Sequence, residues 1–389
     1  MALPRPVKAL GVVSLLTDAS SEMIYPLLPA FLLALGAGPA FVGLVEGLAE
    51  ATAAGLKVAS GWLSDRSRRR KPLIVAGYAL STLARPLLAL AMAPWHVLAI
   101  RLADRTGKGT RGAPRDALIA EVTPASDRGR AFGFHRAMDH AGAFVGPLLA
   151  SAALALGAEM RTVFALCAIP GALCLVVLVL GVRETASPPA PAAADRDAGP
   201  TTSSFRRYLA VLALFALGNS SDAFLLLRAQ DAGVGLTMIP LLWSFHHAIK
   251  SLTSTWGGAV SDRLGRGRTI AAGWAVYALS YLGFAWAASP LHVWLLFALY
   301  ALFPALTEGP ERALVADLAA QARGRAFGLY HAVTGGMLLP ASLLTGAIWQ
   351  AWGPLAALGT GAGLAAVAAA VLLLMVPAQP PADPATGRA

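Results

Sequence analysis

Long apolar runs alternate with short polar segments along the whole chain. Each run is about as long as a helix that crosses a hydrocarbon core of about 30 Å, which takes roughly 20 residues. Glycine, proline or charged residues bound each run, and this pattern predicts twelve membrane-spanning helices. They cover residues 9–35, 39–63, 72–93, 95–120, 131–156, 161–182, 208–228, 233–260, 269–288, 290–318, 325–350 and 353–376.

The composition agrees with a polytopic all-α membrane protein. Of the 389 residues, 57% are hydrophobic and only 13% are charged, whereas a soluble domain carries about 25% charged residues. This balance excludes a large cytosolic enzyme, and the high hydrophobicity excludes a disordered chain. The first apolar run follows Arg5 and Lys8 and continues past Asp18 without a small-residue cleavage site. We therefore expect it to be retained as the first span rather than removed as a signal peptide.

The basic residues fall mainly on one predicted side of the membrane. Because the number of spans is even, both ends of the chain lie on the same side. The loops and the central connector of that side carry sixteen Lys and Arg residues, against only Arg161 and Arg228 opposite. The positive-inside rule then places both termini in the cytoplasm, and the net charge of +10 reflects orientation and anionic lipid rather than nucleic acid. The sixteen are Arg66, Arg68, Arg69, Arg70, Lys71, Arg128, Arg130, Arg183, Arg196, Arg206, Arg207, Arg263, Arg266, Arg268, Arg323 and Arg325.

One central segment differs from the rest in composition. Residues 184–207 are rich in Pro, Ala and small polar side chains, which predicts a flexible cytoplasmic linker. It separates a six-helix bundle at 1–183 from a second at 208–376, which a cytoplasmic tail at 377–389 follows. The two cysteines, Cys167 and Cys174, share one apolar span, so we expect two small buried hydrophobic side chains rather than a metal or redox pair.

The two predicted bundles repeat each other in sequence. GWLSDRSRRRKPLI at Gly61 matches GAVSDRLGRGRTI at Gly258, RGRAFGFHRA at Arg128 matches RGRAFGLYHA at Arg323, and SSEMIYPLL at Ser20 matches SSDAFLLL at Ser220. The matches keep the same order and a nearly constant offset of six helices. Both bundles therefore have the same orientation, which is the parallel repeat of rocking two-bundle transporters.

These repeated loops resemble the major facilitator superfamily of secondary transporters over nearly the whole chain. The family pattern after span two is Gly-x-x-x-Asp-Arg-x-Gly-Arg-Arg, and this chain has Arg68 in place of the second glycine. The resemblance implies twelve helices in two bundles and a conformational latch that stabilises the outward-open state. The residues that carry this latch are Gly61, Asp65 and Arg66 in the first copy and Gly258, Asp262 and Arg263 in the second. We expect Gly61 to let span two approach a helix of the other bundle.

Two further segments resemble the family in part. Gly142, Gly146 and Pro147 on span five resemble the antiporter motif of exporters, although Ala150 and Ser151 stand where a full motif has glycines. The alternative is close helix packing with a proline kink. Span four resembles the family's arginine-containing segment at Arg101 but departs from it at the next charged positions, which argues against a simple drug-efflux assignment.

Charged residues inside the predicted spans are the candidate functional groups, because each costs roughly 2.5–3.5 kcal/mol in the bilayer centre. Asp18 and Glu22 lie on one face of span one with Tyr25 nearby. A carboxylate in a partly dehydrated cavity can load and release protons near neutral pH. The sequence predicts proton coupling here, with substrate contact or a structural ion pair as the alternatives.

Spans two, four and five bring further charges. Glu46, Glu50 and Lys57 form one stripe on span two, and Asp139 lies on span five beside His135, Arg136 and His140. Span four carries Arg101, Asp104, Arg105, Lys108, Arg111, Arg115 and Asp116, of which we expect only Arg101 and Asp104 to lie deep. The near balance of charges favours an interlocking ion-pair network, and recognition of an anionic substrate by Arg101 or Arg105 is the alternative.

The second half of the chain is poorer in charge. Asp222 is its best site candidate, because it repeats Glu22. His246 and His247 point in different directions on a helix, so we expect no metal site. Gly107-Lys108-Gly109-Thr110 only imitates the end of a nucleotide-binding loop, so we expect no cofactor and transport driven by a gradient.

The sequence therefore predicts a monomeric secondary transporter of a bacterial-type inner membrane, not an enzyme. Proton-coupled efflux of a small organic or amphiphilic compound is the leading interpretation. Proton-coupled uptake of an organic anion or metabolite is the alternative, and the two differ on whether the cations of span four touch the substrate. A polytopic membrane enzyme or a receptor would need a catalytic or signalling constellation that the sequence does not offer, and a lipid flippase would share the same fold.

Overall fold

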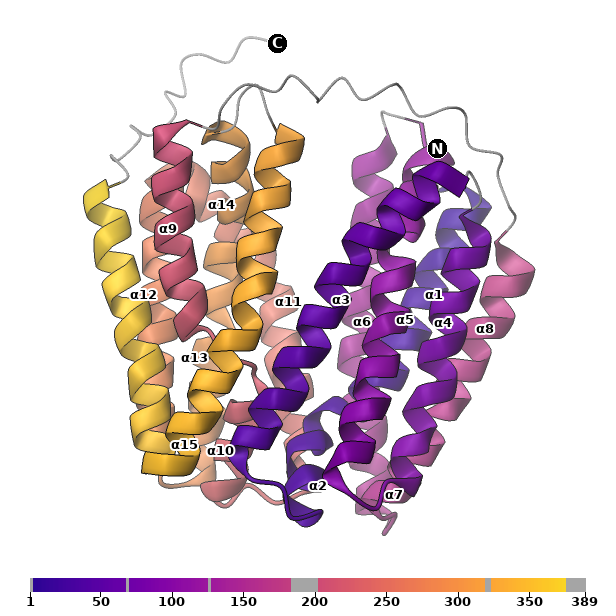
Figure 1. The fold of residues 1–389 in the computed structure, drawn as a ribbon, viewed down its shortest axis with the longest axis horizontal. Helices are drawn as coiled ribbons and strands as arrows, with labels where there is room; N and C mark the ends of the chain where they lie inside the picture. Colours follow the sequence, from indigo (N-terminus) through magenta and orange to yellow (C-terminus); the bar gives the residue numbers. More distant parts are fainter. Residues whose placement is uncertain (1–2, 68–69, 125–126, 183–201, 319–322, 376–389) are drawn as a thin grey trace. The chain divides into compact units, whose positions relative to one another are not determined.

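The computed structural model describes residues 3–67, 70–124, 127–182, 202–318 and 323–375 (Figure 1). Within these ranges all twelve predicted spans are helical. The first six correspond to α1 (Arg5–Glu22) with η1 (Tyr25–Leu27) and α2 (Leu28–Ala34), α3 (Pro39–Ser67), α4 (Lys71–Ala84) with η2 (Arg85–Leu90), α5 (Pro94–Glu121), α6 (Arg128–Ala155), and α7 (Met160–Leu166) with α8 (Ala168–Gly181). The last six correspond to α9 (Ser203–Gly218) with α10 (Ala223–Asp231), α11 (Met238–Leu264), α12 (Arg266–Ala285), α13 (Pro290–Tyr300) with α14 (Leu302–Leu318), and the two arms of α15 (Arg323–Met375).

Most of the predicted linker and the whole tail from residue 377 lie outside the described residues. Helix α9 begins at Ser203, where the Thr202 side chain accepts a hydrogen bond from the backbone N–H of Phe205. A threonine at this position satisfies one of the free amides of the first turn. The division into bundles at 1–183 and 208–376 stays a prediction.

Several spans are interrupted at proline or glycine. Between α1 and α2 the chain passes through a short 3₁₀ segment that contains Pro26, because proline has no N–H to continue the helical hydrogen bonding. Within α15, Gly353 has a φ of 83° and a ψ of 177°, which separates the arm of span eleven from that of span twelve. Only glycine adopts this conformation without strain.

Five spans are long and apolar enough to cross a membrane on length and composition alone. They are Lys71–Leu90, Met160–Gly181, Ser203–Asp231, Pro290–Leu318 and Ala326–Leu374, the last of which contains both arms of α15. Other spans carry more charges within their length, and α5 is the extreme case with arginines at several turns. Those charges lie largely inside the helix assembly, as described below.

The chain divides into two compact units. The first unit contains Met1–Ala193 and Asp222–Phe245, and the second contains Ala194–Ser221 and His246–Ala389. Helix α10 therefore belongs to the first unit, where it packs against α2 and α3. Each unit is described by itself below.

Close packing of α1 on α6 organises the first unit. A methyl group on Gly142 would collide with the carbonyl oxygen of Leu15, and one on Gly146 would lie 2.5 Å from that of Ala19. The two glycines thus let the α1 and α6 backbones touch, in the way small residues do in membrane bundles.

Cys167 and Cys174 are buried and unbridged in the same unit, which confirms the prediction that they are buried hydrophobic side chains.

An aromatic core organises the second unit. The Phe215 ring stacks on Trp274 with their centroids 4.5 Å apart, and Tyr277 stacks on Tyr281 at 4.1 Å. These side chains come from α9 and α12. Aromatic pairs of this kind add about 0.5–1.5 kcal/mol each beyond the area that they bury, so the packing fixes the pocket that lies beside it.

The sequence repeat reappears as two equivalent ion pairs. Arg70 lies 3.0 Å from Glu121 in the first unit, and Arg266 lies 2.6 Å from Asp317 in the second. Both partners are offset by 196 residues. Each pair ties the start of one span to the end of the next.

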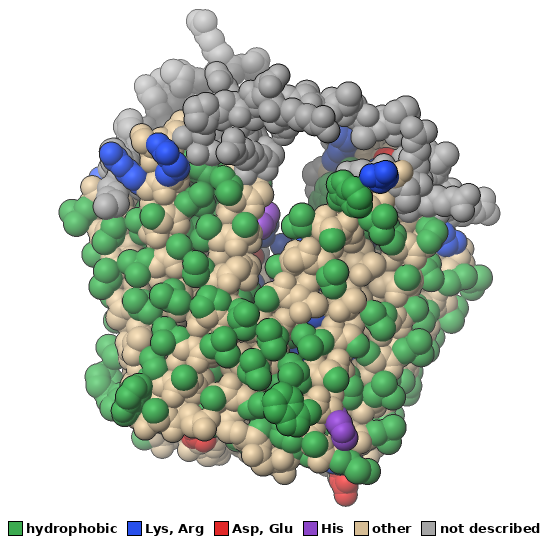
Figure 2. Space-filling view, in the orientation of Figure 1, with side chains coloured by type: hydrophobic (Ala, Val, Ile, Leu, Met, Phe, Trp, Pro, Cys, Tyr) green, Lys and Arg blue, Asp and Glu red, His purple; other side chains and the backbone are tan. Residues whose placement is uncertain are grey.

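The outer surface of each unit is apolar where a bilayer would contact it. Leu156 is 89% exposed and Leu374 is 87% exposed, with many other large hydrophobic side chains. Figure 2 shows hydrophobic side chains spread over the visible face, whereas Lys and Arg side chains gather near one end. Exposed apolar surface of this extent is typical of contact with lipid.

Candidate functional site

Three arginine–carboxylate pairs cross the interior of the first unit. Arg101 Nη2 lies 2.7 and 2.9 Å from the two carboxylate oxygens of Glu46. Arg85 Nε lies 2.8 Å from Asp104 Oδ1, and its Nη1 also donates to the Thr17 carbonyl at 3.0 Å. The third pair follows one turn further along α5.

Arg105 and Glu50 form this third pair, with 3.0 Å between Nη2 and Oε1. Glu50 of span two therefore pairs with a cation of span four. Arg101 also lies 3.7 Å from Asp104, so that neighbouring pairs interlock along α5. A buried charge is tolerated only when it is paired and hydrogen-bonded, and these contacts favour the ion-pair network over a bare anion-binding wall.

The depth of the α5 charges was predicted only in part. Arg101 and Asp104 are 4% and 2% exposed, as expected, but Arg105 and Arg111 are buried as well. Arg111 Nη1 donates to Ser81 Oγ at 2.7 Å, and its guanidinium lies 4.5 Å from the centroid of the Tyr78 ring. The expectation of two deep charges is therefore wrong, because hydroxyl and aromatic partners on α4 accommodate Arg111.

Asp18 and Glu22 of α1 differ from these paired carboxylates. Both are half-buried, and no Lys or Arg nitrogen of a described residue lies within 4.0 Å of either carboxylate. Glu22 Oε2 instead accepts a hydrogen bond of 2.8 Å from Trp243 Nε1. The Tyr25 ring lies 5.3 Å from that of Trp243 and 5.9 Å from the Arg101 guanidinium. The structure thus places Glu22 and Tyr25 against Trp243, with Arg101 near the Tyr25 ring.

Asp139 forms a separate group at the α1–α6 contact. Ser14 donates to it, His135 Nδ1 lies 3.6 Å from it, and the half-exposed Arg136 lies 4.0 Å from it.

Lys108 is exposed and makes no ion pair or hydrogen bond with another described residue. Within the described ranges it is therefore an unpaired cation, one turn from Arg105.

The predicted latch residues are described only in part. Gly61 faces α5 of its own unit, where an added methyl group would lie 3.3 Å from Ala113 Cβ, so the close approach that the structure shows is within one unit. Arg66 is exposed and its guanidinium lies 5.4 Å from the Trp62 ring. Asp262 and Arg263 are exposed at the end of α11. The side chain of Asp65 and the surroundings of Gly258 lie outside the described residues.

The predicted packing motif and Asp222 take clear positions. Gly142 and Gly146 form the α1 contact, and Pro147 is buried next to them within α6. Asp222 is half-buried and caps α10, where its backbone carbonyl accepts hydrogen bonds from the N–H groups of Leu225 and Leu226. Asp222 therefore precedes the first residue of α10, whereas Glu22, at the equivalent position of the sequence repeat, is the last residue of α1.

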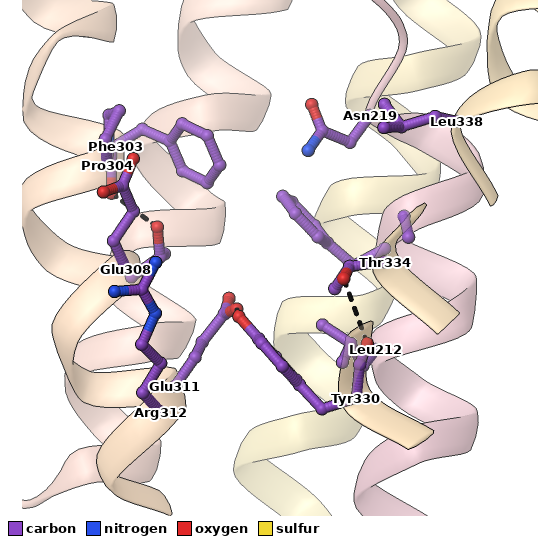
Figure 3. A pocket seen from close by; sticks show the side chains of 13 residues that line it. Leu212, Asn219, Phe303, Pro304, Glu308, Glu311, Arg312, Tyr330, Thr334 and Leu338 are labelled. Carbon is purple, nitrogen blue, oxygen red and sulfur yellow. Dashed lines mark hydrogen bonds between the residues drawn. The ribbon is translucent and has the colours of Figure 1, made fainter. Parts of the chain in front are cut away.

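A pocket that the sequence interpretation missed lies in the second unit (Figure 3). It has a volume of about 220 Å³ between α14 on one side and α9 and α15 on the other. Glu311 is 6% exposed, and its two oxygens accept hydrogen bonds from Trp274 Nε1 at 3.2 Å and from Tyr330 Oη at 2.8 Å. The lining residues are Leu212, Phe215, Ala216, Asn219, Phe303, Pro304, Thr307, Glu308, Glu311, Arg312, Tyr330, Thr334 and Leu338.

A signal for Glu311 was present in the repeat. Pro114 and Pro310 keep the offset of 196 residues, and the residue after each is Arg115 in the first copy and Glu311 in the second. The repeat thus inverts the charge at one position. Arg85, which pairs with Asp104, is the other residue that was not singled out, and an arginine within an apolar span before Pro86 was its signal.

Among the described residues, no cluster of three or more His, Cys, Asp or Glu side chains is placed to hold a metal ion. In the described part of the chain the interior groups are ionic. They are the arginine network of α5, the carboxylates of Asp18 and Glu22 on α1, and Glu311 in the pocket of the second unit.

Comparison with known proteins places this geometry in a family. The profile of the Major Facilitator Superfamily matches residues 10–309. An uncharacterised MFS-type transporter of Methanocaldococcus jannaschii is 35% identical over 357 residues, which cover 90% of this chain and 89% of that protein. The multidrug resistance protein MdtH of Proteus mirabilis is 32% identical over 157 residues, or 39% of each chain.

Solved structures share the fold at low sequence identity. A bacterial homologue of the human lysosomal transporter Spinster, inward-facing and unoccupied, is 16% identical with a TM-score of 0.72 and 96% of both chains covered. A peptide transporter POT in complex with sulfate is 14% identical with a TM-score of 0.79, covering 96% of this chain and 94% of that one. From the profile match and the full-length relative, this chain belongs to the major facilitator superfamily of membrane transporters.

Proposed function

We propose that this transporter exports a small organic or amphiphilic compound in exchange for protons. Transport would proceed by alternating access, with bundles 1–183 and 208–376 rocking about a central site. The observation that carries the proposal is the contrast among the carboxylates of the first unit. Glu46, Glu50 and Asp104 each have an arginine partner, whereas Asp18 and Glu22 have none within 4.0 Å among the described residues.

A carboxylate held by an arginine stays ionised throughout a transport cycle, because protonation would leave the buried cation without its partner. A half-buried carboxylate with only neutral partners can take up a proton when water reaches it and release it on the other side. Glu22, bonded to the neutral Trp243 indole, meets this condition, and Asp18, one turn before it, has no Lys or Arg nitrogen of a described residue within 4.0 Å. Tyr25, Glu50, Arg101, Asp104, Arg105, Asp139 and Asp222 complete the proposed coupling and substrate site.

Two observations support export over uptake. The first is the likeness of 39% of the chain to a multidrug resistance protein. The second is the antiporter-like Gly142, Gly146 and Pro147 segment, whose glycines hold α1 directly against α6. Any movement of α6 would therefore carry Asp18 and Glu22 with it.

The second candidate is proton-coupled uptake of an organic anion. Its support is Lys108, an exposed cation on α5 without a partner among the described residues. Arg101 and Arg105, which the sequence offered as anion-binding groups, are already paired with carboxylates. Export is therefore the better supported of the two.

The test uses full-length protein in liposomes with an imposed pH gradient. Ethidium, a permanent cation, should accumulate inside acid-loaded liposomes, and nigericin should abolish the accumulation by collapsing the gradient. Glu22→Gln and Asp18→Asn should remove the dependence on the gradient while exchange of labelled ethidium across the membrane continues. Asp231→Asn, an exposed carboxylate at the end of α10, is the matched control.

A different result in the same liposomes would favour anion uptake. Accumulation of p-toluenesulfonate driven by acid outside, and lost in Lys108→Ala, would establish anion uptake in place of export. Gradient-independent movement of both probes would reject proton coupling altogether.

We further propose a bacterial-type inner membrane, cytoplasmic termini and a monomer. The sixteen-to-two distribution of Lys and Arg supports the orientation. Reporter fusions at the two ends, one active only in the cytoplasm and one only outside it, test this orientation. The latch role of Gly61, Asp65, Arg66, Gly258, Asp262 and Arg263 rests on the family resemblance.

A further inference from the structure

We infer that the Glu311 pocket of the second unit is a binding subsite for the ammonium group of an organic amine. The inference rests on the proposed transport function only in treating that amine as cargo, because binding itself needs neither a gradient nor a direction. It assigns a role to a carboxylate that the proton-coupling proposal does not use.

The first step is the missing counter-charge. Glu46, Asp104 and Glu311 are all buried, with 2%, 2% and 6% of their surface exposed. The first two have arginine partners, whereas no Lys or Arg nitrogen of a described residue lies within 4.0 Å of Glu311. A buried carboxylate without a cation is costly, and a cationic ligand would remove this cost.

The neighbouring charges do not supply that cation. Glu308 is paired with Lys250 at 2.7 Å. Arg312 follows Glu311 directly, and adjacent residues of a helix do not face each other. Figure 3 shows Glu311 reaching across the pocket towards Tyr330, whereas Arg312 turns towards Glu308.

The second step is the direction of the free acceptor positions. An ionised carboxylate has about four lone-pair sites. Trp274 occupies one on Oε1 and Tyr330 one on Oε2, and both donors are neutral. They hold the carboxylate in one orientation and leave an acceptor position on each oxygen. An ammonium group with two or three N–H donors fits this arrangement, whereas an anion would be repelled.

The third step is the wall of the pocket. The rings of Phe215, Phe303 and Tyr330 line it, and Asn219 and Thr334 add polar atoms. Aromatic faces attract a cation by about 0.5–2 kcal/mol. The volume of about 220 Å³ lies below the roughly 300–1,000 Å³ of sites for drug-sized ligands, so the expected ligand is a small arylalkyl amine or the amine end of a larger molecule.

Calorimetric titration of the purified full-length protein tests this assignment. The probes are 2-phenylethylammonium, its uncharged analogue 2-phenylethanol, and the anion phenylacetate. We expect the ammonium to bind at least about tenfold more tightly than the alcohol, because a hydrogen bond to a charged group contributes more than one between neutral groups. Phenylacetate should bind more weakly than either.

Variants locate the binding. Glu311→Gln should raise the Kd of 2-phenylethylammonium by about tenfold or more, and remove the preference over the alcohol. Glu308→Gln, which deletes the same charge from the same helix, should cause a smaller loss, and the exposed Asp231→Asn should cause none. Thr334→Phe narrows the pocket while keeping Glu311, so it should weaken both ligands and provides a test if Glu311→Gln fails to fold.

Equal affinity for the ammonium and the alcohol, or an unchanged Kd in Glu311→Gln, would overturn the assignment. So would a Thr334→Phe protein that binds the amine as the parent protein does. The proton-coupling proposal is tested separately, by the gradient dependence of transport in Glu22→Gln liposomes, which the affinity of the Glu311 pocket for an amine does not decide. Each proposal can therefore fail without the other.

Discussion

Breaking the Arg101–Glu46 pair is the sharpest test of the ion-pair network. The pair is bidentate on the carboxylate side, at 2.7 and 2.9 Å, and both side chains are at most 5% exposed. Glu46→Gln removes the negative charge and keeps the shape. Among the described residues, Asp104 at 3.7 Å is then the one carboxylate left within 4.0 Å of Arg101. Removing one partner of a buried pair costs about 3–5 kcal/mol, because the remaining charge loses its compensation.

The double replacement separates charge compensation from simple loss of packing. Arg101→Met alone should also cost about 3–5 kcal/mol, but Glu46→Met with Arg101→Met should cost much less than the sum, since no charge is left buried. The measurement is the free energy of unfolding in mixed micelles, titrated with denaturing detergent and followed by tryptophan fluorescence. Additive effects, or single losses under about 1 kcal/mol, would refute the argument that these charges stabilise the unit only as pairs.

Three further predictions concern packing and helix ends. Gly146→Ala should destabilise the protein by about 1–3 kcal/mol because its methyl group meets the Ala19 carbonyl, whereas Gly133→Ala, in open space on the same helix, should stabilise it by about 0.5–1 kcal/mol; unfolding titrations distinguish the two signs. Gly353→Ala should cost about 1–3 kcal/mol by the same measurement, because its φ of 83° strains any other residue, and an unchanged stability would contradict this. Glu121→Gln should lower stability more than Asp317→Asn, because the Glu121 pair is less exposed, and both losses should stay within about 1 kcal/mol; the reverse order would count against the reasoning.

The helical spans were predictable because the bilayer leaves few alternatives. Length, apolar composition and bounding charges identify a span without knowledge of its neighbours. The twelve predicted ranges therefore agree with the helices of the described residues, including the break at Gly353. The short interruption between Gly218 and Ala223 was not predicted, because a change of backbone direction inside an apolar run has no hydropathy signal.

The sequence predicted the numbers of acidic and basic residues inside the spans, but not which residues pair. Balance between acids and bases suggested a network, but the sequence could not show that Arg101 takes Glu46 or that Arg85 takes Asp104, since the partners lie on different helices. It equally gave no reason to expect that Asp18 and Glu22 are left without a cation. Pairing is a property of side-chain geometry between helices, which a single sequence does not encode locally.

The Glu311 pocket shows what a repeat can still reveal. Glu311 lies on span ten, and its aligned position in the first copy holds Arg115. The two copies therefore differ in charge at this position, which identifies it as one where the units are not equivalent. Trp274 of span nine and Tyr330 of span eleven, which lies within the repeated segment RGRAFGLYHA, hold the carboxylate.

The most direct test of the account is proton movement through Glu22 in liposomes. Acid-loaded liposomes with the parent protein should accumulate ethidium until nigericin is added, and Glu22→Gln liposomes should exchange labelled ethidium at the normal rate without accumulating it. Accumulation by Glu22→Gln equal to that of the parent protein would contradict the central claim, because the carboxylate without a cation would then not be the group that couples transport to protons.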